Sequence, residues 1–383
     1  MQLKYGCNPH QLFASADPIG APPVELLNGQ PSLINWLDAL NAWQLVLELR
    51  QSLKLPAAAS FKHVSPSGAA LAVPLSAELA EAYEVAGREL SPVALAYARA
   101  RGADPKCSFG DFVAVSDPVD DAAADYLKSV VSDGIIAPGF EGNALKTLSE
   151  KKNGSFIVLR GDPAFQPPAR ETREIFGMKI TQDRNAHVFS EADLKDVVCG
   201  ELTPEARRDL VLGYTTLKYT QSNSVGFASG GQMIGIGAGQ QSRVDCTKLA
   251  GGKADVWQLR LHPKVLGLRF QPAVKRQDRI NWRVRYIEGD LTEYETRALR
   301  EALLGDLVPL SDQEKREYLS RVSGVSLISD GFIPFRDNID HAQRHGVKFI
   351  AQPGGSTRDA DIEQACREYG IAMVNTKIRA FHH

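Results

Sequence analysis

The strongest constraint on the fold is a regular alternation of apolar runs and helix-like stretches in the C-terminal part of the chain. The pattern predicts strands at 326–328, 348–351 and 371–375, and helices at 336–345 and 359–369. Gly346 and Gly370 follow the two helical stretches, where glycine commonly ends a helix. Because strands and helices that alternate in this order build sheets covered by helices, we expect an α/β fold.

Earlier segments show the same two kinds of pattern. Apolar residues recur at helical spacing after Ser32, a suitable N-cap residue, and Thr203 followed by Pro204 begins a second helix. A hairpin is predicted around Ser229-Gly230-Gly231. Further expectations are a strand at 57–64 that runs into a turn at 65–68 and an Ala-rich helix, a helix end at 132–134, helices within 261–319, and a Pro-rich link at 160–174.

Composition excludes several classes of protein. The 383 residues are 43% hydrophobic and 23% charged, which disfavours disorder and suggests about two to three domain-sized units. Lys plus Arg number 44 against 46 Asp plus Glu, so no global basic field serves nucleic acid or an anionic membrane. The chain shows no apolar h-region of a secretory signal and no apolar run long enough to span a membrane. Five widely spaced cysteines favour neither disulfides nor a metal site, and point to the reduced cytoplasm.

Several familiar motifs are absent. The run Gly235-Ile236-Gly237-Ala238-Gly239 resembles a dinucleotide fingerprint, but Gln follows where the third glycine should fall, and no βαβ unit with a ribose-binding acid is evident. The chain has no P-loop, no H-E-x-x-H and no zinc-deaminase signature. Nucleotide-triphosphate hydrolysis and metal catalysis through these motifs are therefore disfavoured.

Polar clusters at the ends of predicted strands are the remaining candidates for a site. Lys62-His63 combines a group that can take a proton near neutral pH with an ammonium that can stabilise negative charge, although such a pair is also common surface decoration. Neighbouring residues on a strand point to opposite faces, so the pair can serve one site only at a strand end or bend. Asn223, in the run 221–224, can donate to an oxyanion or simply form an Asx turn.

Three further clusters have a plain structural interpretation beside the functional one. The glycines of 237–243 with Arg243 can hold a phosphate or merely form a turn. Asp337, at a helix start within 335–338, can bind a ligand or only complement the helix dipole. The loop 352–357 lies between a strand and a helix, a position suited to ligand binding. The terminal His382-His383 reads equally well as a remnant of an affinity tag.

Together these clusters resemble the formyltransferase (AICAR transformylase) part of the bifunctional purine biosynthesis proteins. The resemblance covers essentially the whole chain, in the right order, at 4–6, 8–11, 62–66, 218–225, 234–243, 335–338, Arg379 and 381–383. Since the family also ends in Phe-His-His, the tag interpretation is dropped. The resemblance implies two cytidine-deaminase-like α/β halves without zinc, which we place at 1–165 and 166–383, with 262–320 packing back on the first half.

The resemblance also implies an assembly and a place in metabolism. A homodimer with active sites at its interface is expected. The usual IMP cyclohydrolase domain is expected to be missing, because the transformylase motif begins at Lys4. Ring closure is then expected from a separate cyclohydrolase. Partners are small molecules, with no nucleic acid and no membrane.

The implied reaction is formyl transfer from 10-formyltetrahydrofolate to the 5-amino group of 5-aminoimidazole-4-carboxamide ribonucleotide (AICAR), the penultimate step of IMP synthesis, with no catalytic metal. His63 would act as general base on the poorly nucleophilic amine, and Lys62 would stabilise the transition state. Asn223 and His383 complete the implied catalytic group. Implied AICAR contacts are Lys4, Tyr5, Gly110, Asp133, Asn223, Arg243, Phe332 and Arg379, and implied folate contacts are Val244, Asp337, Ser356 and Thr357.

One departure and two alternatives qualify this hypothesis. Lys4 stands where many relatives have Arg, so a point charge replaces a bidentate fork at the phosphate. A catalytically silent nucleotide-binding relative is the first alternative, and the retained Lys62, His63, Asn223 and His383 weigh against it. A zinc deaminase on the same architecture is the second, and the missing ligand motif disfavours it.

Overall fold

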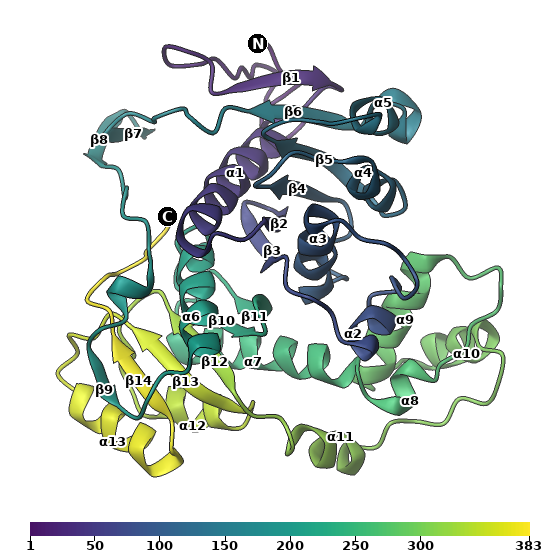
Figure 1. Cartoon of the computed structure of the whole chain (residues 1–383), viewed down its shortest axis with the longest axis vertical. Helices are drawn as coiled ribbons and strands as arrows, with labels where there is room; N and C mark the ends of the chain where they lie inside the picture. The colour runs from purple at the N-terminus through teal and green to yellow at the C-terminus, as the bar shows by residue number, and fades with distance from the viewer.

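A single twelve-stranded mixed sheet runs through the protein, as seen in a computed structural model that describes all 383 residues (Figure 1). Its first six strands, in spatial order, are β1 Val24–Asn28, β6 Ile157–Gly161, β5 Ser132–Ala137, β4 Asp111–Val115, β2 Ala57–Lys62 and β3 Ser65–Leu71. The other six are β11 Gln232–Gly237, β10 Val225–Ser229, β12 Val325–Ser329, β13 Val347–Gln352, β14 Ala372–Asn375 and β9 Val197–Cys199. The mixed α/β architecture expected from the sequence is confirmed.

The two groups of six strands are connected in the same order. Each group contains a hairpin, β2–β3 or β10–β11, whose first strand pairs antiparallel with the next strand along the chain, β4 or β12. Two further strands, β5 and β6 or β13 and β14, then add in parallel. The strand that comes first in the sequence of each group, β1 or β9, forms the outer edge and pairs antiparallel with β6 or β14. The groups meet where β3 pairs with β11, at Ala70 and Gln232. We call the strands β1–β6 the first half and β9–β14 the second half of the sheet.

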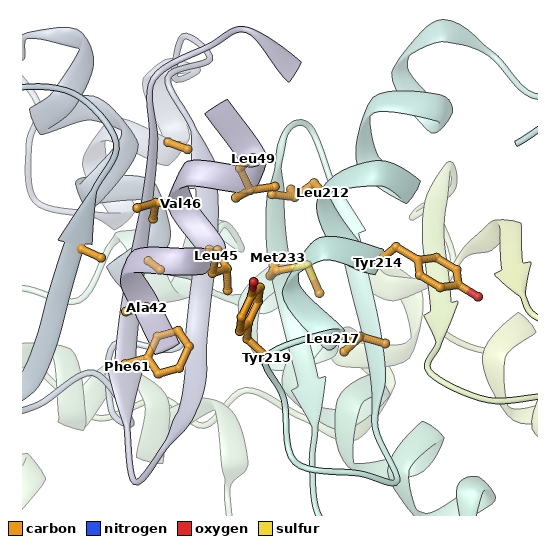
Figure 2. Close-up of a cluster of buried hydrophobic side chains, with 14 of the residues drawn as sticks. Ala42, Leu45, Val46, Leu49, Phe61, Leu212, Tyr214, Leu217, Tyr219 and Met233 are labelled. Carbon is orange, nitrogen blue, oxygen red and sulfur yellow. The ribbon is translucent and has the colours of Figure 1, made fainter. Parts of the chain in front are cut away.

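Helices cover both faces of this sheet. On one face lie α1 Leu33–Leu53 and α6 Pro204–Leu217, and their apolar side chains form one core with residues such as Phe61 and Met233 (Figure 2). On the other face lie α3 Pro92–Ala103, α4 Asp121–Lys128, α7 Arg243–Leu259, α12 Asp337–Gln343 and α13 Asp359–Tyr369. Short helices α2 Ala77–Ala82 and α5 Ala144–Ser149 and 3-10 turns at Lys151–Gly154 and Glu191–Asp193 complete this part. None of the helices is long and apolar enough to cross a membrane.

Residues after α7 form a small helical region with its own apolar core around Leu299. It consists of α8 Pro263–Leu266, α9 Arg276–Glu288, α10 Glu293–Ala302 and α11 Asp312–Leu319. Arg279 and Arg283 of α9 both donate to Glu84, which belongs to the first half of the chain. This region therefore ties the second half of the chain to the first.

A two-stranded hairpin stands apart from the central sheet. It is formed by β7 Arg170–Ile175 and β8 Met178–Asp183, within the connection between the two halves (Figure 1). Almost every residue of this hairpin is exposed, including the apolar side chains of Phe176 and Met178. The link predicted at 160–174 is only partly confirmed, because its ends fall in β6 and β7 and only the Pro-rich residues 162–169 lie between strands.

Most predicted elements are confirmed, and two predictions are wrong. Ser32 and Thr203 cap α1 and α6, and the hairpin with Gly230-Gly231 and the C-terminal β-α-β-α-β order are present. Residues 65–71 form the strand β3 instead of a turn and a helix start, because the chain already reverses at His63 and Val64. Residues 132–134 begin the strand β5 instead of ending a helix, since Ser132 Oγ donates to the Asp111 carbonyl and holds the start of β5 to the start of β4.

Candidate active site

Nearly all candidate side chains lie along one edge of the central sheet. This edge contains the C-terminal ends of β2, β11, β12, β13 and β14. It also contains the N-terminal ends of β3, β4, β5 and β10. We call it the polar edge, and it carries Lys62, Gly110, Asp133, Asn223, Gly237, Asp330 and Gln352 or the loops that continue from them. Strand ends from both halves of the sheet are therefore gathered along one line.

Lys62 and His63 lie where the β2 strand ends, so the condition for both to serve one site is met. Lys62 Nζ donates to the carbonyls of Phe109 (2.6 Å) and Gly110 (3.2 Å), and the His63 side chain is exposed at the turn. A methyl group added to Gly110 would lie 3.1 Å from Lys62 Nζ and 3.8 Å from Asp133 Oδ2. Gly110 therefore lies between an ammonium and a carboxylate, and a side chain at this position would crowd Lys62 Nζ.

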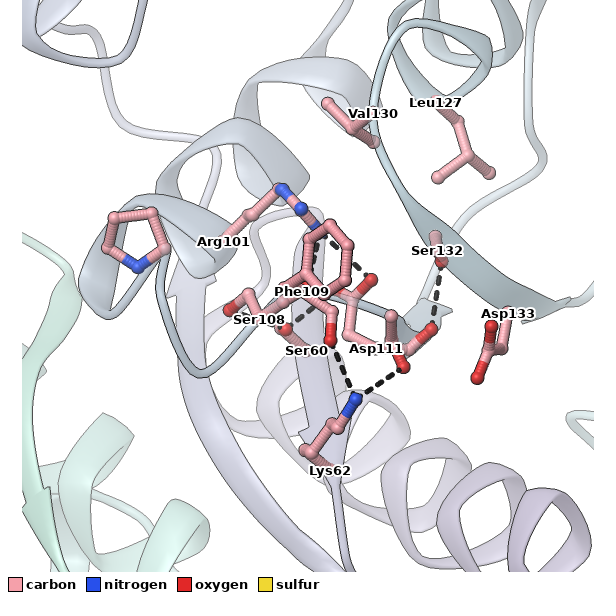
Figure 3. Close-up of polar contacts among 12 residues, drawn as sticks. Ser60, Lys62, Arg101, Ser108, Phe109, Asp111, Leu127, Val130, Ser132 and Asp133 are labelled. Atoms are coloured by element: carbon pink, nitrogen blue, oxygen red, sulfur yellow. Dashed lines mark hydrogen bonds and ion pairs between the residues drawn. The ribbon is translucent and has the colours of Figure 1, made fainter. Parts of the chain in front are cut away.

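A buried ion pair next to this cluster supports it (Figure 3). Asp111 Oδ1 accepts from Arg101 Nη1 at 3.0 Å, and Asp111 Oδ2 accepts from Ser60 Oγ at 2.6 Å. The Tyr97 hydroxyl also donates to Asp111 Oδ2, at 3.1 Å. Arg101 Nη1 also donates to the Ser108 carbonyl at 2.6 Å. Since every group is buried and paired, this network holds the 108–110 loop that Lys62 contacts.

A second cluster surrounds Asn223 in the second half. Its Nδ2 donates to the carbonyls of Gln240 (3.1 Å) and Gln241 (3.2 Å), and its Oδ1 accepts from Arg243 Nη2 at 2.8 Å. Arg243 is itself buried and pairs with Asp330 Oδ1 at 2.5 Å. Both the nitrogen and the oxygen of the Asn223 side-chain amide are therefore hydrogen-bonded within the protein, so the orientation of this side chain is fixed without a ligand.

Arg243 is buried and paired with a carboxylate, whereas the sequence suggested a residue available to bind a phosphate. Its guanidinium is 6% exposed and also donates to Ser329 Oγ at 2.9 Å. Asp330, its ion-pair partner, accepts through Oδ2 from the Ser224 amide at 2.8 Å and from Ser222 Oγ at 2.7 Å. In this structure Arg243 orients Asn223 and the 222–224 segment, and its contact with a phosphate stays a prediction.

The C-terminal residues close over the same segment. His382 N–H donates to Ser222 Oγ, and the Ser222 amide donates to the His382 carbonyl, both at 3.0 Å. Burial, followed by the charge of Arg173, lowers the pKa of His382. The His383 ring lies against Phe381, with ring centroids 5.8 Å apart, and is exposed. The last residues of the chain are thus part of the polar edge.

Beyond β13 and β14 lies a cavity of about 520 Å³. Its lining consists of Phe332, Pro353, Gly354, Gly355, Asp359, Asn375, Lys377 and Arg379. The predicted folate residues Ser356 and Thr357 follow directly in the same loop, and the Ser356 amide donates to Asp359 Oδ1 at 3.2 Å. The Arg379 guanidinium lies 4.6 Å from the Phe381 ring centroid. The cavity combines cations, a carboxylate and a flat aromatic side chain, which suits an anionic ligand with a planar ring.

The structure brings some predicted residues together and leaves others apart. Val244 and Asp337 lie at the starts of α7 and α12, which are linked by a hydrogen bond from Thr247 Oγ1 to Asn338 Oδ1 at 3.2 Å. Lys4 and Tyr5 lie together in the N-terminal segment, with Lys4 Nζ 6.0 Å from the Tyr5 ring, and make no hydrogen bond with the other candidates. Lys62 ends β2 and Asn223 precedes β10, and these two strands are three spacings apart in the sheet, roughly 14 Å.

Sequence reasoning missed three carboxylates that organise these clusters. Asp111 is fully buried at the start of β4, and Asp330 is fully buried directly after β12. Asp38 is buried on α1, where its Oδ1 accepts from the Val64 amide at 2.6 Å. Burial raises the pKa of Asp38 to about 6. These residues could have been found in the sequence as carboxylates on the apolar face of a helix or beside a buried strand, because a buried carboxylate needs hydrogen-bond partners. Three or more His, Cys, Asp or Glu side chains are nowhere grouped so as to hold a metal ion.

Comparison with known proteins places this geometry in a family. The sequence profile of the AICARFT/IMPCHase bienzyme family matches residues 1–253. Similar proteins include the bifunctional purine biosynthesis proteins PurH of Aquifex aeolicus (31% identical over 387 residues) and Oceanobacillus iheyensis (29% identical over 386 residues). In both cases the alignment covers 100% of this chain and 59% of the relative, so the chain spans about three fifths of the length of these curated relatives. The chain belongs to the AICARFT/IMPCHase bienzyme family.

Proposed function

We propose that the chain transfers a formyl group from 10-formyltetrahydrofolate to the 5-amino group of AICAR, giving the formylated ribonucleotide and tetrahydrofolate. The observation that carries this proposal is the presentation of Lys62 and His63 together at a strand end, on the same edge as a pre-oriented Asn223. A base, a cation and an amide are the groups that acyl transfer to a weak amine requires. Relatives of this chain carry names from purine biosynthesis.

In the proposed mechanism His63 takes the proton from the amine as it attacks the formyl carbon. The Lys62 ammonium stabilises the oxyanion of the tetrahedral intermediate and assists departure of the folate nitrogen. Asn223 orients the formyl or carboxamide group through its fixed amide, and His383 lies near the reacting centre. Lys62 donates to two carbonyls of the 109–110 loop in the free protein, so substrate binding must redirect part of its hydrogen bonding.

Substrate contacts in the proposal divide between the two clusters. Tyr5, Gly110 and Asp133 of the first half, with Lys4 as an accessory cation, would hold one side of the ribonucleotide. Phe332 and Arg379 at the 520 Å³ cavity would hold the other side, and the exposed Arg379 is suited to a phosphate. Arg243 would act largely by fixing Asn223. For the folate we propose contacts with Val244, Asp337, Ser356 and Thr357.

A second copy of the chain would bring the two clusters into one site. Within one chain, Lys62 Nζ binds the 109–110 loop before β4, whereas Asn223 precedes β10, three strands from β2 in the sheet. Exposed aromatic side chains along the polar edge, among them Phe109, Phe332 and Phe335, also suit contact with another protein surface. We therefore propose a homodimer whose sites combine the first half of one copy with the second half of the other.

The fold supports a matching proposal for domain organisation. The repeated strand order favours two cytidine-deaminase-like halves, at 1–165 and 166–383, with 262–320 packed on the first half through the contacts of Arg279 and Arg283 with Glu84. In this proposal neither half contains the zinc site of the deaminases. A comparison of each half, superposed on the other by rotation about the β3–β11 junction, tests the repeat directly.

The deciding experiment is a turnover assay with purified protein, AICAR and 10-formyltetrahydrofolate, read out as tetrahydrofolate formation. His63→Ala and Lys62→Ala are expected to lose about 100-fold or more in kcat, because each removes a group that acts in the transition state. Lys146→Ala, which removes an exposed lysine of α5, is the matched control and should turn over as the parent does. A parent that binds the ribonucleotide without turnover would favour the silent relative instead.

Mixing two inactive variants tests the shared site. His63→Ala and Asn223→Ala, each inactive alone, should regain about a quarter of the parent activity when refolded together, because half of the random dimers then carry one intact site. No recovery, from protein shown to be dimeric by analytical ultracentrifugation, would place both clusters of a site in one chain.

A further inference from the structure

The two halves of the sheet each contain a hairpin with a two-residue turn. In the β2–β3 hairpin the turn residues are His63 and Val64, with φ of 53° and 61°. Gly230 and Gly231 take these places in the β10–β11 hairpin, with φ of 61° and 80°. Positive φ at both central residues is typical of a type I′ turn, whose twist matches that of the flanking strands.

A buried aspartate accepts a hydrogen bond from the second residue of each turn. Val64 N–H donates to Asp38 Oδ1 at 2.6 Å, and Gly231 N–H donates to Asp209 Oδ1 at 2.7 Å. Both aspartates are buried, and each stands six residues after the N-cap of its helix, Ser32 in α1 and Thr203 in α6. The same helix-to-turn contact therefore occurs once in each half.

What differs is the side chain that the turn must carry. Glycine adopts positive φ without steric conflict, whereas a Cβ atom in this conformation approaches the backbone, and a β-branched residue such as Val64 does so most severely. Strained backbone of this kind persists only where its surroundings over-determine it, and it gathers at functional sites. The Gly230-Gly231 turn lies at the far edge of the sheet, while the His63-Val64 turn lies at the polar edge.

We propose that Asp38 is a positioning residue, which holds the His63-Val64 turn in its left-handed conformation and thereby presents the His63 side chain at the polar edge beside Lys62. Only the role of His63 as a general base depends on the proposed function. Asp38 touches no substrate in this arrangement and acts through the Val64 amide. Charged and titratable groups around it are Lys62 at the end of β2, His63 of the turn and Asp133 of β5, and burial raises its pKa despite the two basic groups.

The first test measures hydrogen–deuterium exchange of single amides by mass spectrometry in the free, full-length protein. Asp38→Ala should speed exchange of the Val64 amide at least about tenfold and leave that of Gly231 unchanged. The matched control, Asp209→Ala, should do the reverse. An equally protected Val64 amide in Asp38→Ala would overturn the proposal, and this readout stands even if the parent shows no formyl transfer.

The second test separates holding the turn from other roles. Asp38→Ala should lower kcat by at least about tenfold with a nearly unchanged KM for the ribonucleotide, because a misplaced base slows chemistry more than binding. Asp38→Asn keeps an acceptor oxygen and should retain most of the activity, while Asp209→Ala should leave kcat as in the parent. Asp38→Asn as slow as Asp38→Ala would assign the effect to charge and overturn the proposal.

A double variant covers the case in which Asp38→Ala folds poorly. Adding Val64→Gly gives the turn a residue that adopts positive φ without help, as in the other hairpin. The double variant should fold and recover much of the kcat lost by Asp38→Ala. A folded double variant that is no faster than Asp38→Ala would also overturn the proposal.

Discussion

The β2–β3 and β10–β11 hairpins have the same framework and serve different ends. Each follows a long helix whose sixth residue after the N-cap is a buried aspartate bound to the turn. Where the turn has only a structural role it is Gly-Gly, the residue type that the conformation favours. At the polar edge the same turn carries His63 and Val64, so a candidate catalytic base occupies a position that costs the fold free energy.

The two halves also share a second device, a fully buried Arg–Asp pair near the polar edge. Arg101 pairs with Asp111 in the first half, with side chains 5% and 0% exposed, and Arg243 pairs with Asp330 in the second, with side chains 6% and 0% exposed. The first pair holds the loop that Lys62 contacts, and the second holds Asn223. The halves therefore use similar internal supports for different surface groups.

The largest expected effect comes from breaking one of these ion pairs. Asp111→Ala leaves Arg101 buried without its counter-ion, which should lower the free energy of unfolding by about 4 kcal/mol. Urea unfolding followed by tryptophan fluorescence measures it. As a control, Asp183→Ala removes the carboxylate of the exposed Arg170–Asp183 pair and should change little. A small effect at Asp111 would mean that water reaches Arg101.

Exchanging turn chemistry between the hairpins comes next. Gly231→Val places a β-branched residue at φ of 80° and brings its Cβ to 2.8 Å from Val73 Cγ2, so we expect a loss of about 3 kcal/mol in unfolding free energy. The same denaturation assay applies, with Gly20→Val as control, since that glycine has positive φ and no neighbouring atom within 4 Å. Equal losses for both variants would assign the cost to backbone strain and not to crowding.

Protonation of Asp38 gives a third, pH-dependent contrast. Burial raises the pKa of Asp38 to about 6 from 3.8, so the stability associated with its protonated form is present below pH 3.8 and is lost as pH rises through about 6. Asp38→Asn removes this loss. Between pH 4 and pH 7 the unfolding free energy of the variant should therefore rise by roughly 2–3 kcal/mol relative to the parent. Parallel pH curves for the two proteins would contradict this.

The smallest expected effect is relief of strain at the first turn. Val64→Gly should stabilise the protein by about 1 kcal/mol, because the strain of a β-branched residue in the left-handed region exceeds the entropy cost of glycine. Thermal unfolding of parent and variant, beside Val115→Gly as a control in which burial is lost without relief of strain, measures the sign. A destabilised Val64→Gly would show that packing of this half-buried side chain outweighs its backbone strain.

The two hairpins also show how far the sequence could predict the fold. Gly230-Gly231 between apolar runs is a direct turn signal, and that hairpin was predicted with its strands. His63-Val64 carries no such signal, so a continuous strand was expected through residue 64 and the strand β3 was missed. The amide of this turn donates to Asp38, 26 residues away, a contact that the local sequence does not reveal.

The candidate site follows the same rule. Lys62, His63, Asn223 and the loop at 352–357 could be found because polar residues at strand ends are conspicuous in the sequence. The arrangement of these groups could not, since it depends on pairs such as Arg243 with Asp330, which are 87 residues apart. Periodicity also could not show that Arg243 would be buried, because its guanidinium is paired with Asp330 and Asn223, which come from other segments of the chain.

The strand order has a consequence for synthesis of the chain on the ribosome. The outer edge of each half is formed by the strand that is synthesised first, so β1 cannot pair until β6 has been synthesised, and β9 cannot pair until β14 has been synthesised. About 130 residues separate β1 from β6, and at 5–20 residues per second the ribosome needs roughly 7–25 s to supply the partner. During that interval the unpaired edge is exposed to other nascent chains, and the second half repeats the delay with a longer gap before β14 emerges.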